Sequence, residues 1–190
     1  MKLLTFAIPC YNSAAYMRNC IESLLPGGDE VEILIVDDGS TKDNTAQIAD
    51  EYEARYPGIC RAIHQENKGH GGAVNTGIKN AKGIYLKVVD SDDWVNEYAY
   101  GEILDTLSNF YNQGTVLDML LSNYVYEKQG VKKKTVIHYR HAIPKDKIFA
   151  CMEEIRRVSV AAPVHIGDIV IEDCAGTGVP VIATKNVERA

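Results

Sequence analysis

The sequence lacks the features that would place the protein inside a membrane or in a disulfide-linked scaffold. None of its 190 residues belongs to an apolar run long enough to cross a bilayer. The apolar stretch after Met1 is too short for a signal peptide. Cysteine is scarce, since the five cysteines are scattered and form no CxxC pair, which argues against a disulfide framework or a zinc site. We therefore expect a protein of a reducing compartment, the cytoplasm.

Positive charge is also scarce. The chain carries 20 Lys and Arg against 26 Asp and Glu, a formal net charge of −6. Such a chain is a poor general partner for nucleic acid or for an anionic membrane surface. The only basic run, at 132–134, is interpreted as a solvated hairpin tip. With 46% hydrophobic residues the chain can bury a core, which suits one globular domain with at most a small appendage.

Strand-like and helix-like segments alternate along the first 110 residues. Apolar β-branched runs predict buried strands, and amphipathic stretches that begin at polar residues or glycine predict helices. This alternation indicates right-handed βαβ units around a mostly parallel sheet, and therefore an α/β fold. The expected strands cover 3–8, 31–36, 59–64, 84–89, 119–126 and 134–139, and the expected helices cover 14–25, 44–56, 69–81 and 96–110.

Two of the expected strands end in clusters of acidic residues. Asp37 and Asp38 follow the second strand, and Asp90, Asp92 and Asp93 follow the fourth. Ligands in open α/β sheets bind outside the carboxyl ends of the strands. Two aspartates one residue apart can share a hard divalent cation that keeps substrate phosphates as further ligands, and an acidic pair can accept hydrogen bonds from a base or ribose. Both clusters have a structural alternative, because aspartate also caps helices and stabilises turns.

A glycine-rich segment at 69–74 follows the third strand and opens a helix. Val74 stands where the dinucleotide fingerprint G-x-G-x-x-G has its third glycine, which disfavours a dinucleotide oxidoreductase. A nucleotidyltransferase is disfavoured as well, because residues 9–13 form no basic, glycine-rich phosphate loop. A helix N-terminus still favours phosphate. His70 either faces a phosphate or is an ordinary surface residue, and the sequence leaves both alternatives open.

Four motifs occur in a characteristic order. They are Ile-Pro-Cys-Tyr-Asn at 8–12, Ile-Val-Asp-Asp-Gly-Ser-Thr at 35–41, Asn-Lys-Gly at 67–69 with Gly-Ala-Val-Asn-Thr-Gly at 72–77, and Val-Asp-Ser-Asp-Asp-Trp at 89–94. Over residues 1–140 the chain resembles the nucleotide-sugar-binding half of family 2 glycosyltransferases. The resemblance implies the GT-A fold, a Rossmann-like, mostly parallel sheet flanked by helices, here expected to be truncated. It also implies a metal-dependent, inverting transfer of sugar from a nucleotide-sugar donor, with UDP-linked donors as the expected class.

The resemblance assigns roles to individual residues. Asp38 would contact the base or ribose, and Pro9 and Tyr11 would line the base pocket. Asp90 and Asp92 match the DxD pair that binds Mg²⁺ or Mn²⁺, with Asp92 as the expected direct ligand. Val74 departs from the pattern, because many members carry arginine there. The complete expected donor site is Pro9, Tyr11, Asn12, Asp38, Lys68, Gly69, Asn75 and Asp90, and the expected metal ligands are Asp90 and Asp92.

Residues 144–190 do not follow this pattern. They resemble the C-terminal end of a small prokaryotic domain of unknown function, whose CxxC motifs are absent here. We therefore expect a nucleotide-sugar-binding domain over 1–143 and a short α+β appendage over 144–190. The resemblance places the catalytic base well downstream of the DxD segment, often in a Glu-Asp pair. Glu172 and Asp173 occur at a suitable distance, but a structural β segment is the preferred interpretation, so the base is left unassigned.

Two functions remain open. The first is a glycosyltransferase in which an acceptor hydroxyl attacks the anomeric carbon and a cation stabilises the leaving diphosphate. The second is a non-catalytic nucleotide-sugar-binding fragment, or a fusion product that lacks the acceptor site and base. The acceptor is open between glycan, lipid and protein. A lipid acceptor would place the protein peripherally at the inner face of the membrane.

Overall fold

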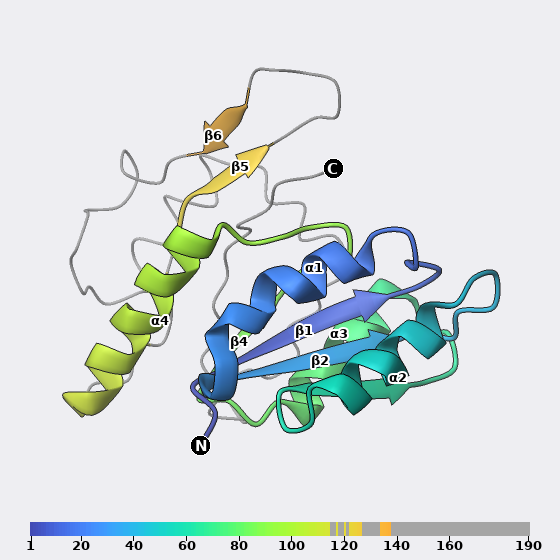
Figure 1. The fold of residues 1–190 in the computed structure, drawn as a ribbon, viewed down its shortest axis with the longest axis horizontal. Coiled ribbons are helices and arrows are strands. Elements are labelled where there is room, and N and C mark those ends of the chain that lie inside the picture. The colour runs from blue at the N-terminus through green and yellow to red at the C-terminus, as the bar shows by residue number, and fades with distance from the viewer. Residues whose placement is uncertain (115–116, 118–119, 121, 127–133, 138–190) are drawn as a thin grey trace.

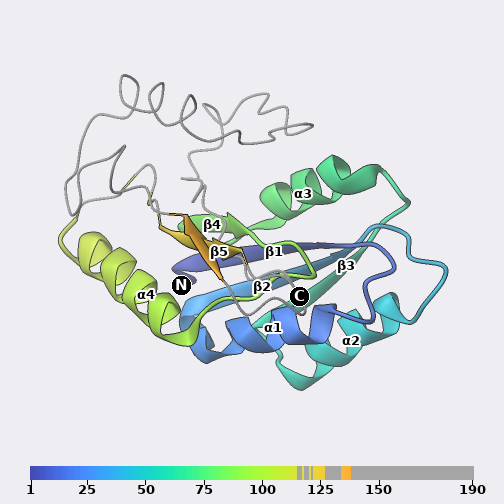
Figure 2. The same ribbon diagram turned by 90° about the horizontal axis from the view of Figure 1, so that it is seen from above.

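The computed structural model describes residues 1–114, 117, 120, 122–126 and 134–137. Within these residues the protein is a three-layer α/β sandwich (Figure 1). The sheet is parallel throughout and its strand order is β3-β2-β1-β4. The edge view in Figure 2 shows α1 and α2 on one face of the sheet and α3 on the other. The strands are β1 (Leu4–Cys10), β2 (Val31–Asp37), β3 (Cys60–His64) and β4 (Tyr85–Val88).

The helices occupy the segments that the sequence predicts, with shifted ends. The first begins at Met17 rather than near residue 14, because the backbone N–H of Ser13 is bound to Thr45 and the chain turns through residues 13–16. A short antiparallel pair follows the sheet where a hairpin is predicted. The elements are α1 (Met17–Leu24), the 3₁₀ helix η1 (Leu25–Glu30), α2 (Thr45–Arg55), α3 (Gly69–Asn80), α4 (Glu97–Asn112), β5 (Tyr124–Tyr126) and β6 (Thr135–Ile137).

The two central strands are buried along their whole length, as expected for a parallel sheet covered by helices on both faces. Side chains alternate between the faces of a strand. In β2, Ile33 and Ile35 join the main core, while Leu34 and Val36 join Ala73 of α3 in a smaller cluster. Each fully buried aliphatic side chain contributes about 1.5–3 kcal/mol, so the alternation of β2 fixes which helices cover which face.

A buried carboxylate near the amino ends of the strands ties three of them together. Glu32 accepts hydrogen bonds from the Thr5 hydroxyl and the Lys82 N–H, both at 2.9 Å. The Thr5 hydroxyl in turn accepts the N–H of Gly83, two residues before β4 begins, at 2.8 Å. Arg61 of β3 approaches the other Glu32 oxygen at 3.3 Å. This network links the amino ends of the strands to one another and supports their register.

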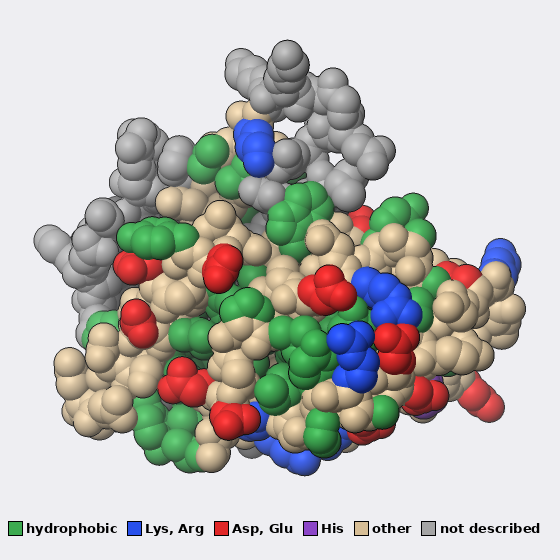
Figure 3. Space-filling view, in the orientation of Figure 1, with side chains coloured by type: hydrophobic (Ala, Val, Ile, Leu, Met, Phe, Trp, Pro, Cys, Tyr) green, Lys and Arg blue, Asp and Glu red, His purple; other side chains and the backbone are tan. Residues whose placement is uncertain are grey.

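The face formed by α1 and α2 carries charges of both signs side by side (Figure 3). Arg18 of α1 forms two hydrogen bonds with Glu51 of α2, at 3.1 and 2.6 Å. Both side chains are about two-fifths exposed, at 42% and 41%, so solvent screens the pair and its contribution to stability is small. Among the helices that the structure describes, none is long and apolar enough to cross a membrane.

Candidate functional site

A cleft of about 460 Å³ opens at the carboxyl ends of the strands. Its walls come from the loops after β1, β2 and β4 and from the start of α3. This is the edge at which parallel α/β sheets bind ligands. Four segments far apart in the sequence therefore meet around one opening. The lining residues are Pro9, Cys10, Tyr11, Ser13, Asp38, Asn67, Gly69, His70, Ala73, Asp90, Ser91 and Asp92.

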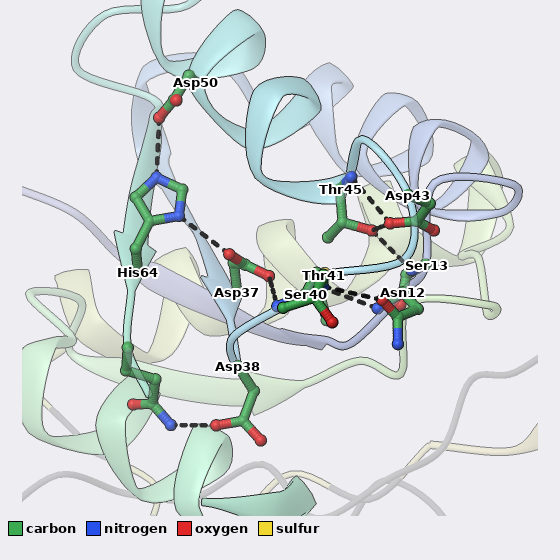
Figure 4. Close-up of polar contacts among 12 residues, drawn as sticks. Asn12, Ser13, Asp37, Asp38, Ser40, Thr41, Asp43, Thr45, Asp50 and His64 are labelled. Carbon is green, nitrogen blue, oxygen red and sulfur yellow. Dashed lines mark hydrogen bonds and ion pairs between the residues drawn. The ribbon is translucent and has the colours of Figure 1, made fainter. Parts of the chain in front are cut away.

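The Asp38 carboxylate is held rigidly in the wall of this cleft. Its residue is only 2% exposed, and its backbone N–H donates to the Cys10 carbonyl at 2.8 Å. Oxygen Oδ1 accepts hydrogen bonds from the Gln65 side-chain amide at 2.5 Å and from the Lys68 backbone N–H at 2.9 Å. Within the described residues both bonds go to Oδ1, and Figure 4 shows how the Asp38 side chain lies beside the loop after β2. Oxygen Oδ2 is therefore the acceptor that a ligand in the cleft can use.

Asp37, the neighbouring carboxylate, is used inside the protein. Its oxygens contact the Ser40 N–H at 3.1 Å and the His64 ring at 3.2 Å (Figure 4). The other His64 nitrogen lies 2.9 Å from Asp50 of α2. The hydrogen bond to Asp50 raises the pKa of His64, burial opposes this shift, and the bond to Asp37 adds to it. Asp37 therefore secures the loop after β2, while Asp38 faces the cleft.

Asn12 connects the loop after β1 to the loop after β2. It has a left-handed backbone, with φ of 50°. Its N–H donates to the Ser40 hydroxyl at 2.9 Å, and its side-chain oxygen accepts the N–H groups of Thr41 and Lys42 at 3.2 and 3.0 Å (Figure 4). The side chain of Asn12 is not among the residues that line the cleft in the described part of the chain. Its contact with a donor stays a prediction.

A pair of hydroxyl groups joins the loop that carries Tyr11 to the loop that carries Asp90 and Asp92. The Ser13 hydroxyl oxygen accepts the Tyr11 N–H at 3.1 Å and the Ser91 hydroxyl at 2.9 Å. Tyr11 is 49% exposed and lies on the cleft, where it can stack on a planar ligand group. The expected base pocket and the expected metal site therefore share one hydrogen-bonded contact.

The acidic cluster after β4 brings three carboxylates together. Asp90, Asp92 and Asp93 each offer an oxygen, and the three oxygens lie within 4.8 Å of one another. Asp92 is exposed, the Asp90 side chain is 26% exposed, and Asp93 is buried. Carboxylate oxygens are the ligands that Mg²⁺ and Mn²⁺ prefer, so the donor set fits such an ion. His70 stands beside the cluster, with Nε2 3.8 Å from Asp90.

The structure places the remaining predicted residues unequally. Gly69, with φ of 76°, lines the cleft where α3 begins, and Lys68 contributes its backbone N–H to Asp38. Asn75 is exposed on α3 and is not among the lining residues that the structure describes. Glu172 and Asp173 lie outside the described residues.

Sequence reasoning missed several residues of the site. It assigned no role to Gln65, although this residue directly follows β3 and so stands at the sheet edge where ligands bind. It also named Asp93 without including it among the ligands. The position of Gln65 and of Asp93 shortly after a strand was the signal that could have assigned both residues to the site. The residues missed are Cys10, Ser13, Gln65, Asn67, Ser91 and Asp93.

The model of the family described as glycosyl transferase family 2 matches residues 5–154. The chain belongs to this family. The match confirms the predicted family and extends beyond residue 143, where the sequence predicts a domain boundary. The boundary itself, and the separate origin of the segment after it, stay predictions.

Two proteins with similar sequences are much longer than this chain. Glycosyltransferase GlyG of Streptococcus pneumoniae is 38% identical over 125 residues, which is 65% of this chain and 39% of GlyG. Chondroitin synthase of Escherichia coli is 40% identical over 151 residues, 72% of this chain and 22% of the synthase. The chain therefore spans well under half the length of these relatives.

Solved structures show the same fold. S. aureus TarS 1-349 in complex with UDP superimposes with a TM-score of 0.54 and 26% sequence identity, over 73% of this chain and 38% of the TarS chain. TarS 1-349 in complex with UDP-GlcNAc gives the same TM-score. The parallel sheet flanked by helices confirms the predicted GT-A fold class.

Proposed function

We propose that the protein binds a UDP-sugar together with a divalent cation, as the donor-binding part of a glycosyltransferase that transfers the sugar to an acceptor hydroxyl. The observation that carries the proposal is the cleft itself. It combines the fixed carboxylate of Asp38 with the carboxylate cluster around Asp90 and Asp92. The TarS structures with UDP and UDP-GlcNAc support this class of donor.

The charge of the cleft supports the need for a cation. Asp38, Asp90 and Asp92 contribute carboxylates to the lining, and among the lining residues that are described only His70 can carry positive charge. A diphosphate placed beside carboxylates is repelled unless a metal ion lies between them. The N-terminus of α3, which opens at Gly69, adds a partial positive charge that also favours phosphate.

Each side chain then has a task in donor binding. Oδ2 of Asp38 accepts a hydrogen bond from the base or ribose, and Tyr11 and Pro9 flank the base. Asp92, with Asp90, would hold Mg²⁺ or Mn²⁺, and Asp93 stands close enough to join or orient them. When bound, the metal ion would neutralise charge on the leaving diphosphate. The base that takes the proton of the acceptor hydroxyl is unassigned, and Glu172 and Asp173 stay predictions.

Calorimetric titration with UDP tests this proposal. We expect UDP to bind in the presence of Mn²⁺, to bind much more weakly in EDTA, and to bind more tightly than ADP, GDP or CDP. Asp92→Ala removes the exposed carboxylate, and we expect it to weaken UDP binding in Mn²⁺ by about tenfold or more. Asp105→Ala, which removes an exposed carboxylate from α4, is the matched control and is expected to bind like wild type.

Two results would contradict the proposal. One is a folded wild-type protein that binds no nucleoside diphosphate in Mn²⁺. The other is an Asp92→Ala protein whose affinity for UDP in Mn²⁺ equals that of wild type, which would remove the metal assignment. Release of free sugar from UDP-sugars, or its transfer to added acceptors, then separates an enzyme from a binding fragment without turnover.

A further inference from the structure

We propose that Gln65 and Thr76 are positioning residues that orient the Asp38 carboxylate for donor binding. The inference rests on the proposed function, in which Asp38 contacts the base or ribose of the donor. Gln65 is the first residue after β3, and its backbone N–H donates to the Asp37 carbonyl at 3.0 Å. This contact places the Gln65 side chain beside the carboxyl end of β2, where Asp38 follows.

The three side chains form a directed chain of hydrogen bonds. The Thr76 hydroxyl of α3 donates to Oε1 of Gln65 at 2.5 Å, and Nε2 of Gln65 donates to Oδ1 of Asp38 at 2.5 Å. A carboxylate only accepts hydrogen bonds, so it requires the amide nitrogen of Gln65 on its side. The Thr76 hydroxyl satisfies the amide oxygen at the other end. Both contacts therefore favour the same orientation of the Gln65 amide.

This chain determines which Asp38 oxygen is offered to a ligand. Gln65 and the Lys68 N–H both donate to Oδ1, which fixes the plane and the rotation of the carboxylate. Hydrogen bonds to a charged acceptor are stronger than those between neutral groups. Because Asp38 is 2% exposed, bulk water has little access to replace a lost donor. Without Gln65, the Lys68 N–H alone would hold Oδ1, and the carboxylate could rotate about that contact and lose the alignment of Oδ2 with the cleft.

The substitution Gln65→Glu distinguishes a positioning role of this residue from a purely structural one. Gln65→Glu keeps the size of the side chain and an acceptor for Thr76, but replaces the donor that faces Asp38 with a second carboxylate. Two adjacent carboxylates repel each other until one is protonated, which raises the pKa of the pair. The variant should therefore bind UDP poorly at pH 8 and regain affinity as the pH falls toward 5.

The experiment measures UDP affinity in Mn²⁺ from pH 5 to 8 for variants of the 190-residue chain. We expect Gln65→Glu to bind about 10–100-fold more weakly than wild type at pH 8, the loss expected for a hydrogen bond to a charged group, and to approach wild type at low pH. Thr76→Val, which keeps the shape of the side chain, should weaken binding by about 2–10-fold, and Thr76→Ser should restore it. Gln47→Glu, on the exposed surface of α2, is the charge control.

His64 adjoins Gln65 and is present in every variant, so each affinity is compared with wild type at the same pH. If wild type binds UDP and Gln65→Glu binds equally well at pH 8, the positioning role is wrong while the proposed function stands. A loss of UDP affinity that stays constant from pH 5 to 8 would also overturn the positioning role. A structural defect weakens binding whether or not the new carboxyl group is protonated. If wild type binds no nucleotide, the proposed function and this inference fall together.

Discussion

Gly39→Ala tests whether the loop after β2 must lie directly against the loop after β3. Gly39 has φ of +73°, in the left-handed region that glycine tolerates and alanine does not. A Cβ at this position would lie 2.9 Å from the Asn67 nitrogen and 3.2 Å from the Gln65 carbonyl oxygen. Both are backbone atoms, so neither can rotate away as a side chain would. The substitution must displace the segment that holds Asp38.

Gly58 provides a matched control for the cost of the backbone conformation. It has φ of +83°, and a Cβ there would meet no atom within 4 Å. A left-handed backbone costs an alanine about 1–2 kcal/mol, so Gly58→Ala should lower the free energy of unfolding by that amount. Gly39→Ala adds an overpacking cost of about 1–3 kcal/mol. We expect it to lower the free energy of unfolding by about 2–5 kcal/mol in total.

Urea denaturation of the two variants and of wild type measures this difference, and UDP titration in Mn²⁺ measures its consequence. Gly39→Ala should weaken UDP binding, because it moves the donors from Gln65 and Lys68 away from Asp38. Gly58→Ala should leave UDP affinity unchanged. Equal destabilisation by the two substitutions would show that the close approach of the two loops does not affect stability. Wild-type UDP affinity in Gly39→Ala would show that it does not affect donor binding.

The strands and the acidic residues of the site could be predicted because both depend on local sequence. Continuous β-branched runs are typical of buried parallel strands, and their order along the chain places Asp38 and Asp92 at one edge of the sheet. The motif resemblance then gave these carboxylates a role. These signals require only that a strand ends near the acidic residues, so a small error in the predicted strand boundary does not change the prediction.

Contacts between distant loops could not be predicted in the same way. Asn12 has an amide side chain of the kind that often binds ligands, yet its side-chain oxygen accepts the N–H groups of Thr41 and Lys42. The hydroxyl contact between Ser13 and Ser91 joins residues 78 positions apart. The conformation of a loop decides whether a polar side chain faces the cleft or another loop. That conformation depends on partners that no local pattern specifies.

The departure from the family pattern at Val74 also depends on packing that the local sequence does not specify. Val74 is 1% exposed, so its side chain belongs to the core. Residue 70 lies one turn earlier on α3, because residues four positions apart on a helix share a face. In this chain His70 already lies there, on the cleft wall. Contact of His70 with a donor phosphate is one of the two alternatives that the sequence leaves open, and its place on the cleft makes that alternative testable.

The remaining predictions concern the cleft and the loop behind it. His64 has a raised pKa in the folded protein, so its charged form stabilises the fold below its ordinary value of 6.5, and this contribution is lost as the pH rises through the raised folded value. Because the ring is 42% exposed, we expect urea denaturation between pH 6 and 8 to show a loss of at most about 1 kcal/mol in wild type, and none in His64→Gln. Ser91→Ala removes the hydroxyl that donates to Ser13, and we expect the gain in UDP affinity on adding Mn²⁺ to fall by about 2–10-fold; an unchanged gain would show that the two loops bind independently. His70→Ala should weaken UDP binding and leave uridine binding unaltered, because only UDP carries the phosphates that His70 would meet. Equal loss for both ligands would place His70 at the base instead, and no loss for either would make it an ordinary surface residue.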